Sequence, residues 1–93
     1  MANYKLSKLA EEDLKRIHQY GTKKFGAAQA DKYFFNFFER FEEIAQRPFS
    51  FEDVSHIAPG YRRCVSGVDT IYFRVGKEFI EVMAIIGRQD FQL

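Results

Sequence analysis

Phenylalanines crowd residues 34–41, and this cluster constrains the fold more than any other feature of the chain. Around it, apolar residues recur at intervals of three and four, which is the spacing of one face of an α-helix. They are Ala30, Phe34, Phe37, Phe41 and Ile44. Pro48 ends the pattern because the residue before a proline disfavours the helical conformation. The spacing predicts a helix over residues 27–46.

Phe35 and Phe38 lie beside this stripe and widen the apolar face beyond the arc that one helix seam needs. Two interpretations follow. In the first, the helix is buried between another helix and a sheet. In the second, the side chain of Phe35 or Phe38 is exposed and binds a partner.

A first helix is predicted before it. Tyr4–Leu6 reads as a short extended start, and the Ser7 hydroxyl suits the N-cap position of a helix. Apolar residues then follow at helical spacing through Leu14 and Ile17, and Gly26 suits a helix end.

Residues 48–60 contain both prolines and are expected to form a loop. Three strands are predicted after it, with turns at Gly67 and Gly76. They are Tyr61–Ser66, Thr70–Val75 and Phe79–Gly87.

The predicted class is α+β in the order β-α-α-β-β-β, with the helical hairpin packed on a mainly antiparallel sheet. The length of 93 residues predicts a single domain, 1–93.

Side chains alternate between the two faces of a strand, so assumed turn lengths predict which residues share a face. A three-residue loop at 67–69 would pair Cys64 with Tyr72 and Arg62 with Arg74, and a two-residue loop would follow at 76–77. The face expected to be buried comprises Val65, Ile71, Phe73, Val75, Ile80, Val82, Ala84 and Ile86. The opposite face comprises Arg62, Cys64, Ser66, Thr70, Tyr72, Arg74, Phe79, Glu81, Met83 and Ile85.

The opposite face mixes charge with the apolar side chains of Phe79, Met83 and Ile85. A face that only meets water does not need these three, so they indicate an interaction surface or an amphiphilic solvent face. Two arginines facing each other, as expected for Arg62 and Arg74, repel unless an anion or an acidic partner lies between them.

The composition restricts the chemistry. Lys and Arg total 14 against 13 Asp and Glu, which disfavours a dedicated nucleic-acid-binding protein. Cys64 is the only cysteine, so neither a disulfide nor a cysteine-based zinc site is expected, and no metal or cofactor is predicted. Neither a signal peptide nor an apolar run of membrane-spanning length is recognisable, and the cytoplasm is the predicted location.

Four arginines could stabilise a phosphate group in an RNA-cleaving site. They are Arg62, Arg63, Arg74 and Arg88. Such a site also needs a general base and a general acid, for which Tyr72 and Glu81 are the candidates in the predicted sheet. His18 and His56 fall in a helix and a loop, so the set is incomplete and no catalytic residue is assigned.

Several segments, in order along nearly the whole chain, resemble ParE-type toxins of the RelE/ParE superfamily. Residues 4–14, YKLSKLAEEDL, contain the pattern Ser-x-x-Ala-x-x-Asp-Leu that follows the extended start of these toxins. Residues 26–33 resemble their second helix, residues 59–63 the entry to their sheet, and residues 71–75 their central strand. Residues 86–91, IGRQDF, resemble their Gly-Arg-x-Asp terminus.

The resemblance implies the toxin of a type II toxin–antitoxin pair that is used in plasmid stabilisation. ParE toxins inhibit DNA gyrase by protein contact and trap it on cleaved DNA, and a ParD-like antitoxin neutralises them. Nucleic acid would be reached only through gyrase or the antitoxin. The alternative is a ribosome-dependent mRNA endonuclease of the RelE type, although a His or Tyr typical of RelE near the C-terminus is missing here.

Two sets of contact residues are predicted from the resemblance and the surface pattern. Candidates for contact with the target are Arg62, Arg63, Arg74, Arg88, Asp90 and Phe91. Candidates for contact with the antitoxin are Phe35, Phe38, Tyr72, Phe79, Met83 and Ile85. Phe91 is costly to leave in water, so either it plugs the edge of the sheet or Arg88 and the tail contact the target.

Overall fold

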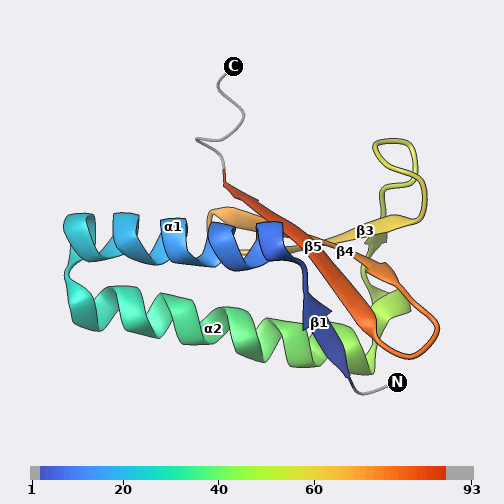
Figure 1. Ribbon diagram of the computed structural model, residues 1–93, viewed down its shortest axis with the longest axis horizontal. Coiled ribbons are helices and arrows are strands. Elements are labelled where there is room, and N and C mark those ends of the chain that lie inside the picture. Colours follow the sequence, from blue (N-terminus) through green and yellow to red (C-terminus); the bar gives the residue numbers. More distant parts are fainter. Residues whose placement is uncertain (1–2, 88–93) are drawn as a thin grey trace.

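The computed structural model describes residues 3–87, which form two long helices, a short 3-10 helix and five strands (Figure 1). The helical elements are α1 (Lys8–Phe25), α2 (Ala27–Gln46) and η1 (Pro48–Ser50). The strands are β1 (Tyr4–Leu6), β2 (Glu52–Asp53), β3 (Tyr61–Ser66), β4 (Asp69–Val75) and β5 (Ile80–Gly87). The predicted order of the main elements is confirmed, and β2 is an additional short strand within the expected loop.

The five strands form one sheet in the order β1-β5-β4-β3-β2. β1 runs parallel to β5, and the other neighbouring strands are antiparallel. The hairpin of α1 and α2 packs on one face of this sheet, and its closed end projects beyond the strands (Figure 1). The predicted α+β class is therefore confirmed.

The two helices begin and end where their sequence signals lie. Ser7 is the N-cap of α1, and its hydroxyl oxygen accepts a hydrogen bond from the Ala10 N–H at 3.0 Å. Gly26 joins the helices with a φ of 91°, a conformation in which a side chain would be strained. α2 ends at Gln46, two residues before Pro48.

The core lies between the hairpin and the sheet. The predicted stripe of α2 supplies Phe37, Phe41 and Ile44, which are completely buried, and Ala30. The side chains that meet this stripe from α1 and the sheet include Ala10, Leu14, Ile17, Ile71, Phe73, Ile80, Val82 and Ile85. Each fully buried large apolar side chain contributes about 1.5–3 kcal/mol of transfer free energy.

Side chains of α1 complete the edge of β5 where β1 ends. Beyond Leu6 no strand pairs with that side of β5 within the described residues. Ser7 Oγ donates to the Met83 carbonyl at 2.7 Å, and Asp13 Oδ2 accepts from the Ile85 N–H at 2.9 Å. Arg16 Nη2 approaches the Ile85 carbonyl at 3.4 Å. Since buried backbone groups need partners, these contacts give Ser7 and Asp13 of the Ser-x-x-Ala-x-x-Asp-Leu pattern a structural reason.

The predicted register between β3 and β4 is wrong by one residue. Cys64 pairs with Ile71 and Ser66 with Asp69, so the turn contains only Gly67 and Val68. A slip of one residue moves every side chain of a strand to the other face. Cys64 and Ser66 are consequently buried, whereas Val65 is 60% exposed.

The β4–β5 hairpin differs from the prediction in two ways. Its loop contains four residues, 76–79, but this two-residue change leaves Ile80 and Val82 on the buried face as predicted. A β-bulge beside Tyr72 and Phe73 then reverses the alternation of β5. Ile85 is completely buried and is not on the exposed face, so its predicted exposure is wrong, and Ala84 and Ile86 are only half-buried.

Candidate functional site

Charged side chains form a row across the face of the sheet that the helices leave uncovered, hereafter the outer sheet face. The strand registers place Glu52, Arg63 and Tyr72 opposite one another, and likewise Arg74, Glu81 and Lys5, and the two sets meet on β4, where Tyr72 and Arg74 are two residues apart. From β2 to β1 the row contains Glu52, Arg63, Tyr72, Arg74, Glu81 and Lys5. Three of the predicted contact residues, Arg63, Tyr72 and Arg74, are thus brought together.

Each arginine of the row has a carboxylate partner. Arg63 donates through Nε and Nη2 to the two oxygens of Glu52 at 2.8 and 3.1 Å. The Glu52 carboxylate raises the pKa of Arg63, with a smaller contribution from Tyr72, and Arg63 in turn lowers the pKa of Glu52. Arg74 Nε donates to Glu81 Oε1, which raises the pKa of Arg74. The two arginine charges of the row are therefore balanced by carboxylates, and Lys5 leaves one net positive charge.

Arg62 does not face Arg74, and the predicted repulsion between them is wrong. Its Cα partner in β4 is Phe73, and its side chain turns to the side of the sheet that the helices cover. The guanidinium donates to the Phe51 carbonyl at 2.8 Å and lies 5.0 Å from the Phe49 ring centre. Arg62 thus ties the segment around η1 to β3, and it does not join Arg63 and Arg74.

Tyr72 and Glu81, the candidates for a general base and a general acid, both lie on the outer sheet face, whereas the two histidines do not. Neither His18 in α1 nor His56 in the loop after β2 lies in a strand. His18 Nε2 instead lies 2.7 Å from Asp31 Oδ1 and links the two helices. Within residues 3–87, no group of three or more histidine, cysteine, aspartate or glutamate side chains could hold a metal ion.

The aromatic side chains of α2 form a second candidate surface. Phe35 is 64% exposed, and its ring contacts Phe34 at a centroid distance of 5.7 Å. Phe38 is half-buried between Phe34 and Phe41, with centroid distances of 5.2 and 5.4 Å. The structure therefore favours burial for most of the wide apolar face and leaves Phe35 as its exposed member.

Phe79 and Met83 come together beside β1. They line a shallow hollow of about 330 Å³ with Lys5, Leu6 and Glu81. The Lys5 ammonium lies 4.7 Å above the centre of the Phe79 ring. Phe79 and Met83 are half-buried, and this hollow adjoins the charged row through Lys5 and Glu81.

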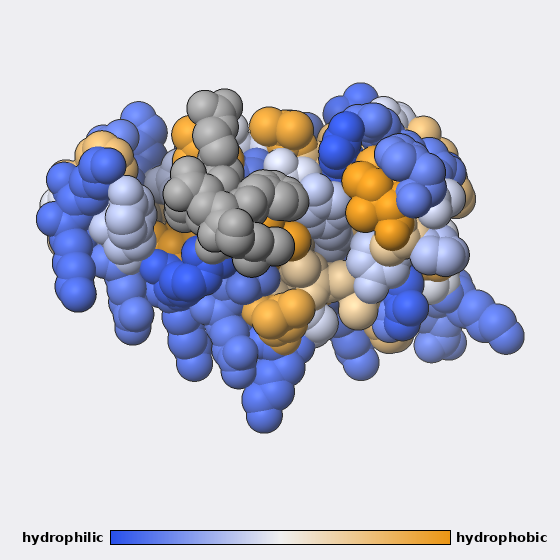
Figure 2. Space-filling model, turned by 90° about the horizontal axis from the view of Figure 1, so that it is seen from above, coloured by the Kyte–Doolittle hydropathy of each residue, from blue (hydrophilic) through white to orange (hydrophobic). Residues whose placement is uncertain are grey.

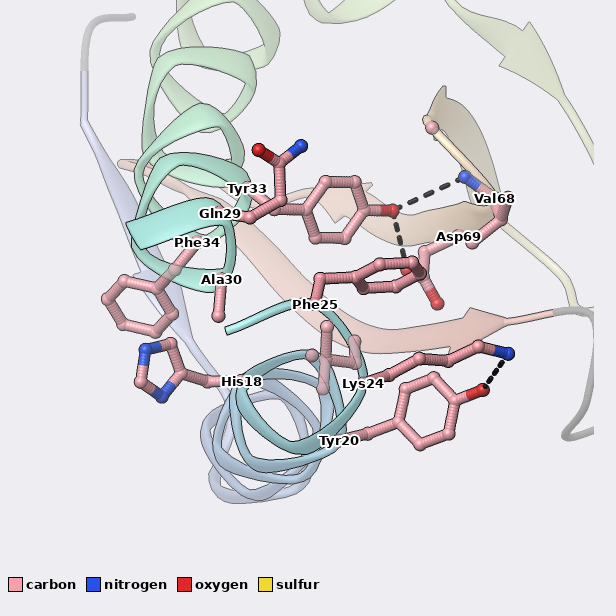
Figure 3. A pocket seen from close by; sticks show the side chains of 13 residues that line it. His18, Tyr20, Lys24, Phe25, Gln29, Ala30, Tyr33, Phe34, Val68 and Asp69 are labelled. Carbon is pink, nitrogen blue, oxygen red and sulfur yellow. Dashed lines mark hydrogen bonds between the residues drawn. The ribbon is translucent and has the colours of Figure 1, made fainter. Parts of the chain in front are cut away.

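A larger cavity, which the sequence analysis did not predict, lies at the closed end of the helical hairpin and is hereafter called the hairpin cavity (Figure 3). It measures about 480 Å³ and lies between the C-terminal end of α1, the N-terminal end of α2 and the β3–β4 turn. Its walls are mainly apolar and aromatic, and include Ile17, Tyr20, Phe25, Ala30, Phe34 and Val68. Figure 3 shows Phe25 and Tyr33 pointing toward Asp69 across this cavity.

A buried polar contact lies at the base of the hairpin cavity. The Tyr33 hydroxyl lies 2.7 Å from Asp69 Oδ2 and 2.9 Å from the Ser66 carbonyl, and it accepts a hydrogen bond from the Val68 N–H at 3.3 Å. Burial, followed by the contact with Asp69, raises the pKa of Tyr33. Gly67 has a φ of 64°, and a side chain at this position would collide with the Tyr33 ring. The β3–β4 turn therefore packs closely against α2.

The remaining predicted target-contact residues, Arg88, Asp90 and Phe91, lie outside the described residues.

Seen from above, the molecular surface is largely hydrophilic, and its hydrophobic areas are separate patches (Figure 2). In residues 3–87, neither helix combines the length and the apolar character that crossing a membrane would require.

Comparison with known proteins places the chain in a family. The family model for the ParE toxin of the type II toxin–antitoxin system parDE matches residues 4–90. Toxin ParE1 of Caulobacter vibrioides is 33% identical over 86 residues, which cover 92% of this chain and 88% of that protein.

Two solved structures share the fold. A chain of the chromosomal ParDE TA system from P. aeruginosa superposes with a TM-score of 0.82 at 21% identity, covering 94% of this chain and 96% of that one. The solution structure of HP0894 from Helicobacter pylori gives a TM-score of 0.60 at 12% identity, covering 96% and 97%. The arrangement of elements and the match along nearly the whole chain confirm the resemblance: this protein belongs to the ParE toxin family of type II toxin–antitoxin systems.

Proposed function

We propose that this chain inhibits DNA gyrase by protein–protein contact, stabilises the complex of gyrase with cleaved DNA, and is neutralised by a ParD-like antitoxin. Membership of the ParE family supports the proposal. The similar chain from P. aeruginosa comes from a ParDE toxin–antitoxin system, which supports an antitoxin partner for this chain as well.

The pairing of the arginines on the outer sheet face carries the proposal. A guanidinium that is to grip a phosphate of RNA must offer its planar fork of donors to that phosphate. Here Glu52 occupies the fork of Arg63 in a two-point contact, and Glu81 binds Arg74. Such a face matches a protein surface that carries both signs of charge better than it matches a polyanion.

The residues proposed for the two contacts overlap on the outer sheet face, and the antitoxin set also extends to α2. For gyrase we propose the outer sheet face with Arg63 and Arg74, together with the predicted Arg88, Asp90 and Phe91. For the antitoxin we propose Phe35 and Phe38 on α2, and Tyr72, Phe79 and Met83 on the sheet. Ile85 is left out because it is fully buried in the core, and Arg62 because it holds the η1 segment.

The free energy that apolar burial contributes to antitoxin binding can be estimated. Burying three or four such apolar side chains would contribute about 1.5–3 kcal/mol each before the cost of ordering the antitoxin segment. Phe35 offers the most gain because it is the most exposed of the five.

A test uses purified gyrase with relaxed plasmid DNA. The chain is expected to slow supercoiling and to raise the amount of linear DNA released when gyrase is denatured, and a ParD-like antitoxin should reverse both effects. If the folded chain at micromolar concentration leaves both reactions unchanged, the gyrase proposal fails.

A charge-swapped pair supplies a matched control. The double variant Arg63→Glu with Glu52→Arg keeps an ion pair at the same place in the sheet, so its melting temperature should stay close to that of the wild type. Loss of gyrase inhibition in this variant would support a contact through Arg63, whereas Lys15→Glu on the exposed side of α1 should inhibit normally. The RelE-type alternative instead predicts cuts within coding regions at a fixed position in each codon.

A further inference from the structure

The strand β1 forms an open edge of the sheet. It pairs with β5 on one side, and the described part of the chain places no strand on its other side (Figure 1). The Asn3 carbonyl accepts a hydrogen bond from the Ile80 N–H at 3.0 Å. Farther along, the Ser7 N–H donates to the Val82 carbonyl at 2.9 Å. Alternate residues of a strand bond to a parallel neighbour, so Asn3, Lys5 and Ser7 are the residues that bond to β5.

The backbone groups of Tyr4 and Leu6 therefore point away from β5. Each residue offers one N–H and one C=O on that side, and within residues 3–87 no group is hydrogen-bonded to them there. Unpaired backbone groups at the edge of a sheet are a template on which another extended chain can pair. Such a chain would lie about 4.8 Å from β1.

On one side, an extended chain at this edge would meet α2. The Tyr4 ring points to that side, and its centre lies 5.3 Å from that of Phe41. The next aromatic ring, Phe38, lies 5.4 Å from Phe41, and the exposed Phe35 follows toward the start of α2. In Figure 1 most of α2 extends on the side of β1 that is away from β5, which is the direction from Phe41 to Phe35.

On its other side, the same chain would meet the hollow on the outer sheet face. Lys5 points to this side, with its ammonium over the Phe79 ring, and Phe79 and Met83 line the hollow. Side chains of a strand alternate between the two faces of a sheet. One chain beside β1 would therefore reach Phe38 with one set of side chains and the hollow with the other.

We propose that an extended segment of the antitoxin pairs with β1 as an additional strand, through the outward N–H and C=O groups of Tyr4 and Leu6. The inference rests on the proposed function, because it takes the antitoxin as the partner. It gives one binding geometry to two groups of antitoxin candidates that lie on opposite faces of the sheet, namely those on α2 and those in the hollow.

The charges beside the edge indicate the chemistry of the segment. Glu42 on α2 is exposed, and it adds to the rise in the pKa of Tyr4 that burial causes. Lys5 is exposed on the opposite side. Since opposite charges on neighbouring strands attract, the segment should carry apolar side chains on both faces, a basic residue toward α2 and an acidic residue beside Lys5.

A second copy of this chain suits the edge less well than such a segment. Two β1 strands that pair about a two-fold axis through the groups of Tyr4 and Leu6 would place the two Lys5 side chains directly opposite each other. Like charges in that position repel, and a lysine on an edge strand is a common protection against pairing between copies.

Backbone hydrogen exchange followed by NMR tests the pairing residue by residue. In the isolated chain, the N–H groups of Tyr4 and Leu6 should exchange much faster than that of Lys5, which is bonded to β5. An excess of a full-length ParD-like antitoxin should slow the exchange of both by at least about tenfold. Protection that instead grows with the concentration of the isolated chain would point to a second copy and would overturn the proposal.

A proline supplies a matched comparison. Leu6→Pro removes one outward N–H, whereas Leu6→Ala keeps it, and proline is tolerated where the N–H of an edge strand faces solvent. The two variants should melt at similar temperatures, but Leu6→Pro should bind the antitoxin about tenfold more weakly in a calorimetric titration, because the acceptor on the antitoxin loses its donor. Tyr4→Pro with Tyr4→Ala repeats the comparison at the other donor.

The results separate this inference from the proposed function. If a complex forms and Tyr4 and Leu6 still exchange rapidly, or if the proline and alanine variants bind equally, the edge pairing is overturned while the antitoxin remains a partner. If no complex forms, the antitoxin partner and the edge pairing both fail. A chain that leaves gyrase unaffected but shows the expected protection would overturn the target alone and support the edge pairing.

Discussion

Replacing Asp13 tests the contacts by which α1 completes the edge of β5. In Asp13→Ala the N–H of the fully buried Ile85 loses its acceptor at 2.9 Å, and the ion pair with Arg16 at 3.4 Å is also lost. Because the Asp13 side chain is only 13% exposed, water has little access to replace it. A buried donor left without a partner costs about 1–3 kcal/mol. At about 4–8 °C per kcal/mol for a domain of this size, a loss of about 2 kcal/mol lowers the melting temperature by about 8–16 °C.

Chemical denaturation and thermal melting of three variants would measure this effect. Asp13→Asn keeps an oxygen acceptor for the Ile85 N–H and should lose less stability than Asp13→Ala. Glu12→Ala changes an exposed carboxylate in the same turn and should cost less than about 0.5 kcal/mol. If Asp13→Ala is no more destabilising than Glu12→Ala, the explanation of the Ser-x-x-Ala-x-x-Asp-Leu pattern is wrong.

Other substitutions test the remaining parts of the structure. Tyr33→Phe removes the hydroxyl that joins α2 to the β3–β4 turn and should cost about 1–3 kcal/mol in denaturant unfolding, whereas Tyr20→Phe, which loses only an exposed contact with Lys24, should be near neutral. Since the pKa of Tyr33 is raised in the folded protein, its contribution to stability is complete below its ordinary pKa near 10 and is lost as the pH rises through the raised value. Stability measured from pH 9 upward should therefore fall less in Tyr33→Phe than in the wild type, and parallel curves would contradict the assignment. Gly67→Ala should destabilise by more than about 1 kcal/mol, because it combines a positive φ with a contact of 2.6 Å to Tyr33, and it should exceed Gly60→Ala, whose φ is also positive but whose surroundings are open. Phe35→Ser should leave the melting temperature unchanged and weaken antitoxin binding about tenfold in a calorimetric titration, whereas Glu39→Ser on the same helix should not; equal affinities would place the antitoxin elsewhere.

The helical half of the fold was predictable because local signals determine it. The Ser7 cap, the glycine between the helices and Pro48 set the ends of α1 and α2, and the spacing of the apolar residues set their buried faces. These signals act within a few residues of each other, so no long-range information is needed to interpret them.

The faces of the sheet were predicted only in part, because they depend on single residues in turns. The β4 side chains from Thr70 to Val75 were assigned to the correct face, whereas β3 was reversed because Val68, rather than Asp69, is the last residue of the turn. In β5 the assignment holds up to Val82 and fails after the bulge. No turn residue marks that bulge, since the run from Ile80 to Ile86 contains neither glycine nor proline.

The candidate sites were also predicted only in part, because they combine residues from separate strands and helices. The predicted register placed Arg63 and Arg74 on opposite faces, and they share the outer sheet face only because the true register of β3 is shifted by one residue. The carboxylate partner of Arg63, Glu52, comes from β2, which has no apolar pattern to reveal it. The hairpin cavity joins Phe25, Tyr33 and Asp69 from three separate elements. Only the packing of the hairpin on the sheet brings such residues together, so no spacing in the sequence could indicate them.

The most direct test of the account is to induce this chain alone in bacterial cells and to measure the SOS response together with the integrity of coding mRNA. Contact inhibition of gyrase predicts that SOS reporter expression rises within the first generations, that a co-expressed ParD-like antitoxin suppresses the rise, and that primer extension detects no cuts phased to codons. Growth arrest with codon-phased cuts and an unchanged SOS reporter would contradict the account and assign the chain to the mRNA endonucleases.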